Sequence, residues 1–220
     1  MRLSAATVMC GNNYVKNIDE VFDRHVYFLP NDVKYFVFTD EVDVCKEKLQ
    51  KFNREIEFVC VSLNDNSVHE YNILLTWKGE SFWNYFLNFD RVLIFQPDSG
   101  LLRPGIEEFY QYDFIGAPLP QNNIAYYPYC CNGGLSLRNP QLMLDICKTY
   151  RWPANKGEDL FFSEMMVTHN LGKLPDRNTS AKFSVETEFM LGSLGYHKPW
   201  QYLSHEQCQE IYTQYNKDLT

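Results

Sequence analysis

The sequence has no long apolar run and no basic stretch. A membrane-spanning helix needs about 20 consecutive apolar residues, and none of the apolar runs among the 220 residues approaches that length, so we expect no membrane span. The formal net charge is −8, and so acidic a chain has little with which to neutralise a phosphate backbone. We therefore expect no nucleic-acid partner.

Recognisable targeting and cysteine patterns are also missing. The start of the chain has only a short apolar run before Gly11, which does not resemble a secretory signal. The seven cysteines are an odd number, and their spacing fits neither a zinc site nor a disulfide framework. These features predict reduced thiols in a cytoplasmic protein.

Alternation of strand and helix patterns is the main positive signal. Strands are predicted at 4–10, 33–39, 56–61, 91–95 and 114–118, and a further strand follows Gly134. Helices are predicted at 17–29, 46–52, 106–112, 140–150, from 158 onward and within 204–216. One more helical stretch, 70–89, is interrupted around Gly79. This order predicts the α/β class, with a mixed, mostly parallel central sheet flanked by helices. No linker or repeat divides the chain, so we expect one domain over residues 1–220. The Gly-x-Gly-x-x-Gly signature is absent, which argues against a dinucleotide site.

One stretch, residues 91–100, organises the candidate chemistry. Val92 to Phe95 predict a strand buried on both faces, Pro97 ends it, and Gly100 is expected to allow a turn. Asp98 would then lie at the carboxyl end of the strand, where open α/β sheets bind ligands. A carboxylate there can hold a divalent cation against phosphate oxygens. The alternative is that Asp98 is an ordinary turn residue.

Two further segments suggest a site. Gly133 and Gly134 precede a strand and would let the backbone pass close to a ligand. Glu158 and Asp159 open a helix, where acidic residues can simply complement the helix dipole. The loop at 119–130 is long for a compact domain, which is often a sign of function.

Several motifs, in this order along the chain, resemble glycosyltransferases of the GT-A fold. They are Val37-Phe-Thr-Asp40, Leu93-Ile-Phe-Gln-Pro-Asp-Ser99, Tyr112-Asp-Phe-Ile-Gly-Ala-Pro118, Asn132 to Asn139, and Glu158-Asp159. The resemblance is closest to a GT-A-like family of bacteria, fungi and large DNA viruses, and it covers roughly residues 5–200. It implies a single GT-A (Rossmann-like) domain, with a nucleotide-binding half over about 1–100 and an acceptor half over about 101–200. The implied activity is transfer of a sugar from a nucleotide-diphosphate donor, UDP above all, to a hydroxyl of a glycan or glycoprotein.

The resemblance also implies a metal. In GT-A enzymes an Asp-x-Asp strand end holds Mn²⁺ or Mg²⁺, and Asp98 takes the second Asp position with His197 as a further ligand. Gln96 replaces the first Asp, which leaves metal use open. The segment Gly195-Tyr-His-Lys-Pro-Trp200 is also similar to glycogenin-like transferases, in which the Lys position, here Lys198, contacts phosphate. Gly192 stands where that subgroup has its ligand His, so the two assignments compete.

The remaining implied roles concern catalysis and donor binding. Asp159 would be the base if the reaction inverts configuration, with Glu158 binding the acceptor or supporting Asp159; in a retaining enzyme neither need act as a base. Gly133 and Gly134 are expected to line the donor-sugar or acceptor side. Donor contacts are expected from Asn12, Asn13, Tyr14 and Asp40 in the nucleotide pocket, from Gln96 at the ribose, and from Lys78 and Arg91 at phosphate.

Two other functions stay open. The first is a GT-A-like module that has lost catalysis and only binds glycans or nucleotides, which the replacement at Gln96 favours. The second is a nucleotidyltransferase, which would carry a Gly-rich N-terminal signature with Arg and Lys that residues 4–20 lack.

Overall fold

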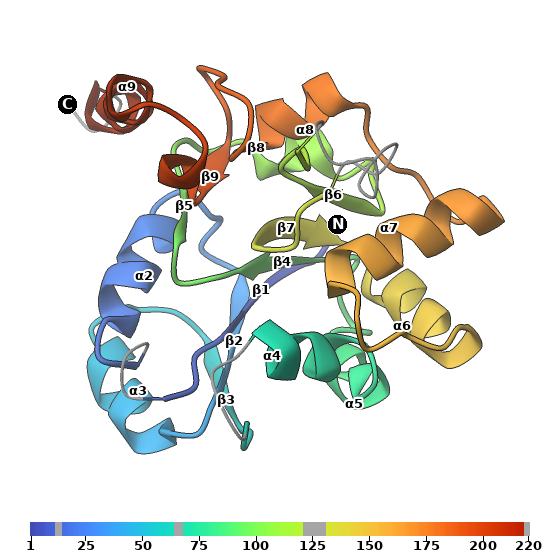
Figure 1. The fold of residues 1–220 in the computed structure, drawn as a ribbon. Coiled ribbons are helices and arrows are strands. Elements are labelled where there is room, and N and C mark those ends of the chain that lie inside the picture. Colours follow the sequence, from blue (N-terminus) through green and yellow to red (C-terminus); the bar gives the residue numbers. More distant parts are fainter. Residues whose placement is uncertain (12–14, 64–67, 121–130, 218–220) are drawn as a thin grey trace.

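A computed structural model describes residues 1–11, 15–63, 68–120 and 131–217. Its centre is a six-stranded sheet with the strand order β3-β2-β1-β4-β7-β6 (Figure 1). The strands are β1 (Leu3–Val8), β2 (Lys34–Thr39), β3 (Ile56–Cys60), β4 (Arg91–Phe95), β6 (Phe114–Gly116) and β7 (Leu135–Arg138). The first four pair in parallel, and β7 runs antiparallel to both β4 and β6. The predicted α/β class with a mixed, mostly parallel sheet is confirmed.

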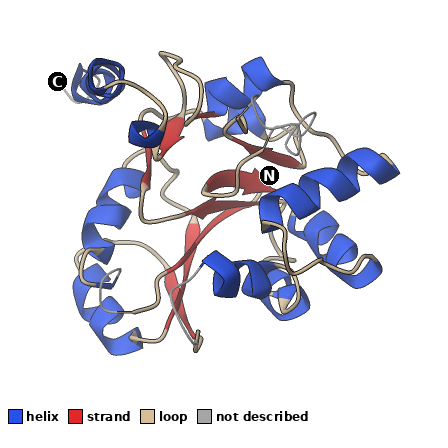
Figure 2. Ribbon diagram, viewed as in Figure 1, coloured by secondary structure: helices blue, strands red, loops and turns tan. Residues whose placement is uncertain are grey.

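Helices cover both faces of this sheet (Figure 2). They are α2 (Ile18–Val26), α3 (Val42–Leu49), α4 (Val68–Leu75), α5 (Gly79–Asn84), α6 (Pro140–Thr149), α7 (Glu158–His169), α8 (Arg177–Phe183) and α9 (His205–Lys217), with the short 3₁₀ helices η1 (Ile106–Phe109) and η3 (Pro199–Gln201). In Figure 1, α2 and α3 lie on one side of the sheet and α4 to α7 on the other. No helix within the described ranges is both long and apolar enough to cross a membrane.

Strand β4 shows why the sheet needs both helix layers. Leu93 and Phe95 join the core beneath α2 and α3, whereas Val92 and Ile94 join the core beneath α4 to α7. Successive side chains of a strand point to opposite faces, and here both faces are fully covered. The predicted strand, buried on both sides, is confirmed.

Two local predictions need correction. Helix α3 begins at Val42, four residues before its predicted start at residue 46. Gly100 does not form a turn, because it lies in strand β5 (Ser99–Leu101). A Cβ atom on Gly100 would come within 2.8 Å of the Tyr196 ring, so this position needs a glycine for space.

Strand β5 belongs to a second, three-stranded sheet that we did not predict. It pairs antiparallel with β9 (Gly195–His197), which pairs in turn with β8 (Ser184–Val185). Such short strands carry no periodic signal, and their pairing joins segments almost a hundred residues apart. The pairing places His197 opposite Ser99, directly beside the end of β4.

The order of the strands predicts where a ligand would bind. From β1 the chain builds the sheet outward through β2 and β3, and it then returns to place β4 on the other side of β1. Open α/β sheets bind ligands at such a switch point, outside the carboxyl ends of the strands. Gly11 and Asp98 both lie at this edge, just beyond β1 and β4.

Candidate functional site

The turn after β4 is held on two sides. The Gln96 N–H donates to the carbonyl of Gly134 at 2.8 Å, and the Ser99 hydroxyl donates to the carbonyl of Gln96 at 2.7 Å. From α2, the Arg24 guanidinium donates to the carbonyls of Pro97 at 2.5 Å and Ser99 at 3.2 Å. Asp98 is therefore presented by a fixed turn. The role of Arg24 was missed because nothing in the helix pattern of α2 distinguishes it from a surface arginine.

His197 lies against Asp98 at this edge of the sheet. Its Nε2 atom is 3.3 Å from Asp98 Oδ1 and 3.2 Å from Gln96 Oε1, while its Nδ1 atom is 3.3 Å from Glu186 Oε1. Burial by itself would lower the pKa of His197, but the two carboxylates outweigh burial and the pKa is raised. Glu186 was also missed by sequence analysis, because its contact depends on the pairing of β8 with β9.

Lys198 completes this cluster. Its φ angle of 42° is left-handed, a conformation that a non-glycine residue adopts only at some cost. The turn lets its N–H donate to the Asp98 carbonyl at 3.1 Å, with Nζ 3.6 Å from Asp98 Oδ2. Burial opposes ionisation of Asp98, but His197 and Lys198 together hold its pKa below the ordinary value.

Gly133 and Gly134 join this cluster to the acidic pair of α7. The Gly133 N–H donates to Asp159 Oδ2 at 3.2 Å, and Gly134 lies against the His197 ring, where a Cβ atom would overlap Nε2. The two glycines therefore connect two groups of side chains that are distant in the sequence. The close approach of their backbone to a ligand stays a prediction.

Gly134→Ala should be poorly tolerated, because the new methyl group would displace the His197 ring. Overpacking of this kind typically costs about 1–3 kcal/mol of unfolding free energy, which urea denaturation would measure. The double variant Gly134→Ala/His197→Ala is the control, since removal of the ring makes room for the methyl group. A double variant less stable than His197→Ala alone would show that another contact is responsible.

Glu158 is not available to a substrate. Its buried carboxylate accepts hydrogen bonds from Arg138 Nη1 at 2.5 Å and Nη2 at 2.8 Å. Arg138 is itself fully buried and lies 4.5 Å from the centre of the Phe114 ring. Of the two expected roles of Glu158, the geometry supports that of holding Asp159 and excludes contact with an acceptor.

Asp159 lies beside this buried pair and is itself partly exposed. It accepts hydrogen bonds from the Gly133 and Leu160 N–H groups. Burial and the neighbouring Glu158 charge outweigh these bonds and raise the pKa of Asp159 to about 6. A carboxyl group of this kind is well matched to accept a proton near neutral pH.

Helix α4 closes the site on a further side. Asn72 Oδ1 accepts a hydrogen bond from the Glu158 N–H at 3.2 Å. Burial, and next the Glu158 charge, raise the pKa of the neighbouring Tyr71. The Tyr71 hydroxyl is buried without a hydrogen bond of good geometry to any described residue.

These side chains also include atoms that could hold a metal ion. The described residues contain no group of three His, Cys, Asp or Glu side chains that could hold a metal by itself. They do offer Asp98 Oδ1, which is buried and lacks a hydrogen bond from the described residues, with His197 Nε2 and Gln96 Oε1 beside it. Mg²⁺ commonly uses one or two protein carboxylates together with substrate phosphates. Glu186 behind His197 matches the carboxylate that often supports a ligating imidazole. The site therefore fits an ion that is shared with phosphates.

The other residues predicted to contact the sugar donor lie at several places in the fold. Asp40 is exposed and accepts the Gly11 N–H at 2.9 Å, at the end of β1. Asn12, Asn13 and Tyr14 lie outside the described residues.

Arg91 and Lys78 need correction. Arg91 begins β4, at the edge of the sheet opposite Asp98, and its guanidinium donates to the carbonyls of Tyr110 and Tyr112 at 2.9 Å each. It therefore supports the η1 segment and contacts no phosphate at the site. Lys78 is exposed beyond the carboxyl end of α4, whereas the start of that helix contacts the site.

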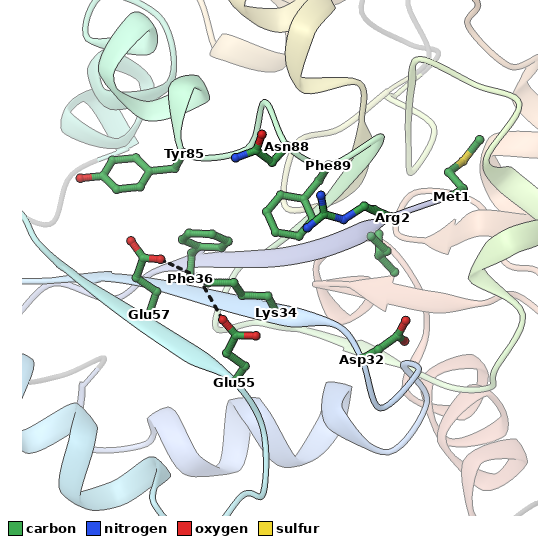
Figure 3. A pocket seen from close by; sticks show the side chains of 11 residues that line it. Met1, Arg2, Asp32, Lys34, Phe36, Glu55, Glu57, Tyr85, Asn88 and Phe89 are labelled. Carbon is green, nitrogen blue, oxygen red and sulfur yellow. Dashed lines mark ion pairs between the residues drawn. The ribbon is translucent and has the colours of Figure 1, made fainter.

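A cavity of about 350 Å³ at the opposite edge of the sheet does not compete with this site. Figure 3 shows it among the first residues of the strands, with Lys34 between two glutamates. Lys34 Nζ lies 2.9 Å from Glu57 and 3.1 Å from Glu55. Because Lys34 is already paired with these two carboxylates, it offers little to a charged ligand.

Comparison with known proteins identifies a family. A family profile described as "Protein of unknown function (DUF5672)" matches residues 55–199, which is more than half of the 220 residues. No curated protein matches the chain.

Proposed function

The chain belongs to the DUF5672 family, and we propose that it is a glycosyltransferase that moves a sugar from a nucleotide-diphosphate donor to a hydroxyl of a glycan or glycoprotein. The carrying observation is the convergence of two groups at the switch point of the sheet. A cationic and metal-compatible cluster, formed by Asp98, His197 and Lys198, is joined through Gly133 and Gly134 to Asp159. The first group suits a diphosphate, and Asp159 suits an acceptor hydroxyl.

The chemistry divides between these groups. A bond forms between the acceptor oxygen and the anomeric carbon, and the bond from that carbon to the diphosphate breaks. Asp159 takes the proton of the acceptor hydroxyl, and the Lys198 ammonium stabilises the charge that develops on the leaving nucleoside diphosphate. A divalent cation held by Asp98 and His197 would add positive charge on the same side. Glu158 and Arg138 hold the start of α7 and thereby the position of Asp159.

The compartment is part of the proposal. Cys10, Cys45, Cys60, Cys147 and Cys208 are free thiols, which supports a reducing environment such as the cytoplasm.

The test of the proposal is calorimetric titration with UDP and UDP-sugars, with and without Mn²⁺, on the wild type and on Asp98→Ala. We expect binding to be stronger with Mn²⁺ and to fall at least about tenfold in the variant, since Asp98 is the carboxylate that would hold the metal in this proposal. Asp43→Ala is the matched control, because Asp43 is exposed on α3.

The outcomes separate the candidate functions. Incubation of the best-bound UDP-sugar with a panel of acceptor glycans should release UDP. Binding without any release of UDP would favour the module that has lost catalysis. No binding of any nucleotide would refute the transferase.

A further inference from the structure

A second cavity of about 880 Å³ lies between the end of α4, the last turn of α6 and the segment that follows it. Its lining includes the aromatic residues Trp77, Tyr150 and Trp152 and the cations Lys148 and Arg151. We propose that this cavity binds an acidic saccharide, as the distal part of the acceptor. The assignment of the saccharide as acceptor rests on the proposed function.

The three aromatic side chains of the cavity differ in the contacts that they make with the rest of the protein. The Tyr150 ring stacks on His169 at 4.3 Å between centres, and the Trp152 indole donates to the Lys156 carbonyl at 2.9 Å. Trp77 is 75% exposed and has no ring contact with any described residue. An indole face is flat, apolar and weakly negative, which suits the C–H face of a sugar ring.

The charges of the cavity point to an anionic ligand. Lys148 and Arg151 are exposed, and neither forms an ion pair within the described part of the chain. No carboxylate side chain is among the lining residues, although the whole chain carries a net charge of −8. Two uncompensated cations beside an aromatic face favour a ligand that bears carboxylates on an apolar ring.

A nucleic acid would also combine rings with negative charge, but it fits less well. Proteins that bind single strands use a long positively charged groove along the backbone. Here the positive charge is confined to one cavity on an acidic protein. A uronic-acid saccharide needs only a local cation at each acidic sugar.

The chain that lines the cavity leads directly to the candidate catalytic residues. The segment from Tyr150 leads into α7, which begins with Glu158 and Asp159, and α4, α6 and α7 lie on the same side of the sheet (Figure 1). Asn72 of α4 accepts a hydrogen bond from the Glu158 N–H. Trp77, two residues after the end of α4, lines the cavity, so the cavity begins beside the helix that contacts Glu158. In this assignment the saccharide occupies the cavity and its end reaches Asp159.

The experiment is calorimetric titration of the full chain with an oligogalacturonate of defined length, with maltohexaose and with a short oligothymidylate. The variants are Trp77→Ala and Lys148→Gln/Arg151→Gln. The matched controls are Tyr27→Ala and Lys46→Gln, which alter exposed residues directly after α2 and within α3. We expect the wild type to prefer the oligogalacturonate. Each cavity variant should weaken its binding about tenfold or more, whereas the controls should leave it unchanged.

Two results would overturn the assignment: equal affinity of the cavity variants and the wild type, or tighter binding of the oligothymidylate. UDP binding without oligogalacturonate binding would overturn this inference while leaving the transferase standing. Oligogalacturonate binding that requires Trp77, without any UDP binding, would support the saccharide site and refute only its role in transfer.

Discussion

Asp159→Asn should lower the rate of sugar transfer by about 10²–10⁴-fold, the range in which a positioned general base contributes. The amide keeps the size of the side chain but cannot accept the proton of the acceptor hydroxyl. Donor binding should change little, because Asp159 reaches the Asp98 cluster only through the backbone of Gly133 and Gly134. Release of UDP at saturating donor and acceptor is the measurement.

The pH dependence tests the same assignment. The pKa of Asp159 is raised to about 6, so the base is mostly ionised only above that pH. The wild-type rate should therefore rise as the pH increases from about 5 to 7 and then level off. This limb should be absent from the residual rate of Asp159→Asn.

Stability distinguishes loss of chemistry from misfolding. The folded-state pKa of Asp159 is higher than its ordinary value of 3.8, so the folded protein binds more protons than the unfolded chain between those values. The stabilisation that comes from the raised pKa of Asp159 is fully present below pH 4, and it is lost as the pH rises through 6. At pH 7, Asp159→Asn should therefore be more stable than the wild type by on the order of 1–2 kcal/mol. A variant that transfers sugar at the wild-type rate would remove Asp159 from the reaction, and one that is less stable would contradict the pKa argument.

Arg138→Met should destabilise the fold by about 3–5 kcal/mol, the usual cost of leaving one partner of a buried ion pair uncompensated. Arg138 and Glu158 are both buried, and the Arg138 guanidinium provides both of the side-chain hydrogen bonds to the carboxylate. The loss should be measurable by urea or thermal unfolding. Arg138→Lys should recover little of it, because an ammonium group cannot reproduce the paired geometry.

The controls for this prediction use one related pair and one double variant. Arg103→Met breaks an exposed pair with Glu108 and should cost less than about 1 kcal/mol. In Arg138→Met/Glu158→Gln the buried charge is gone, so much of the stability should return. If the double variant is as unstable as Arg138→Met alone, packing of Arg138 on Phe114 and its neighbours, and not the ion pair, accounts for the loss.

The sequence was sufficient for the main sheet because its strands and helices carry strong periodic patterns. It was also sufficient for the strand end at Asp98, since a buried apolar run followed by Pro97 can end in few ways. The three-stranded sheet could not be predicted, because its strands are two or three residues long and pair across large separations. The contact between Glu186 and His197 could not be foreseen for the same reason.

Two errors in the site have different causes. Arg91 was assigned to phosphate from its charge alone, although its place at the start of β4 already put it at the edge of the sheet away from Asp98. Glu158 was treated as a possible acceptor contact because sequence does not show that Arg138, twenty residues earlier, encloses its carboxylate. Charged residues with buried partners resemble functional residues until their neighbours are known.

The pairing of β5 with β9 also has a consequence for synthesis of the chain on the ribosome. Asp98 leaves the ribosome about a hundred residues before His197 and Lys198, which lie beside it. Contacts over so long a separation form late and slowly, and domains acquire their structure as the chain leaves the ribosome. A nascent chain that ends before β9 should therefore carry much of the main sheet, but Asp98 would lack its contacts with His197 and Lys198. The proposed capacity to bind a nucleotide would be gained only after β9 has left the ribosome.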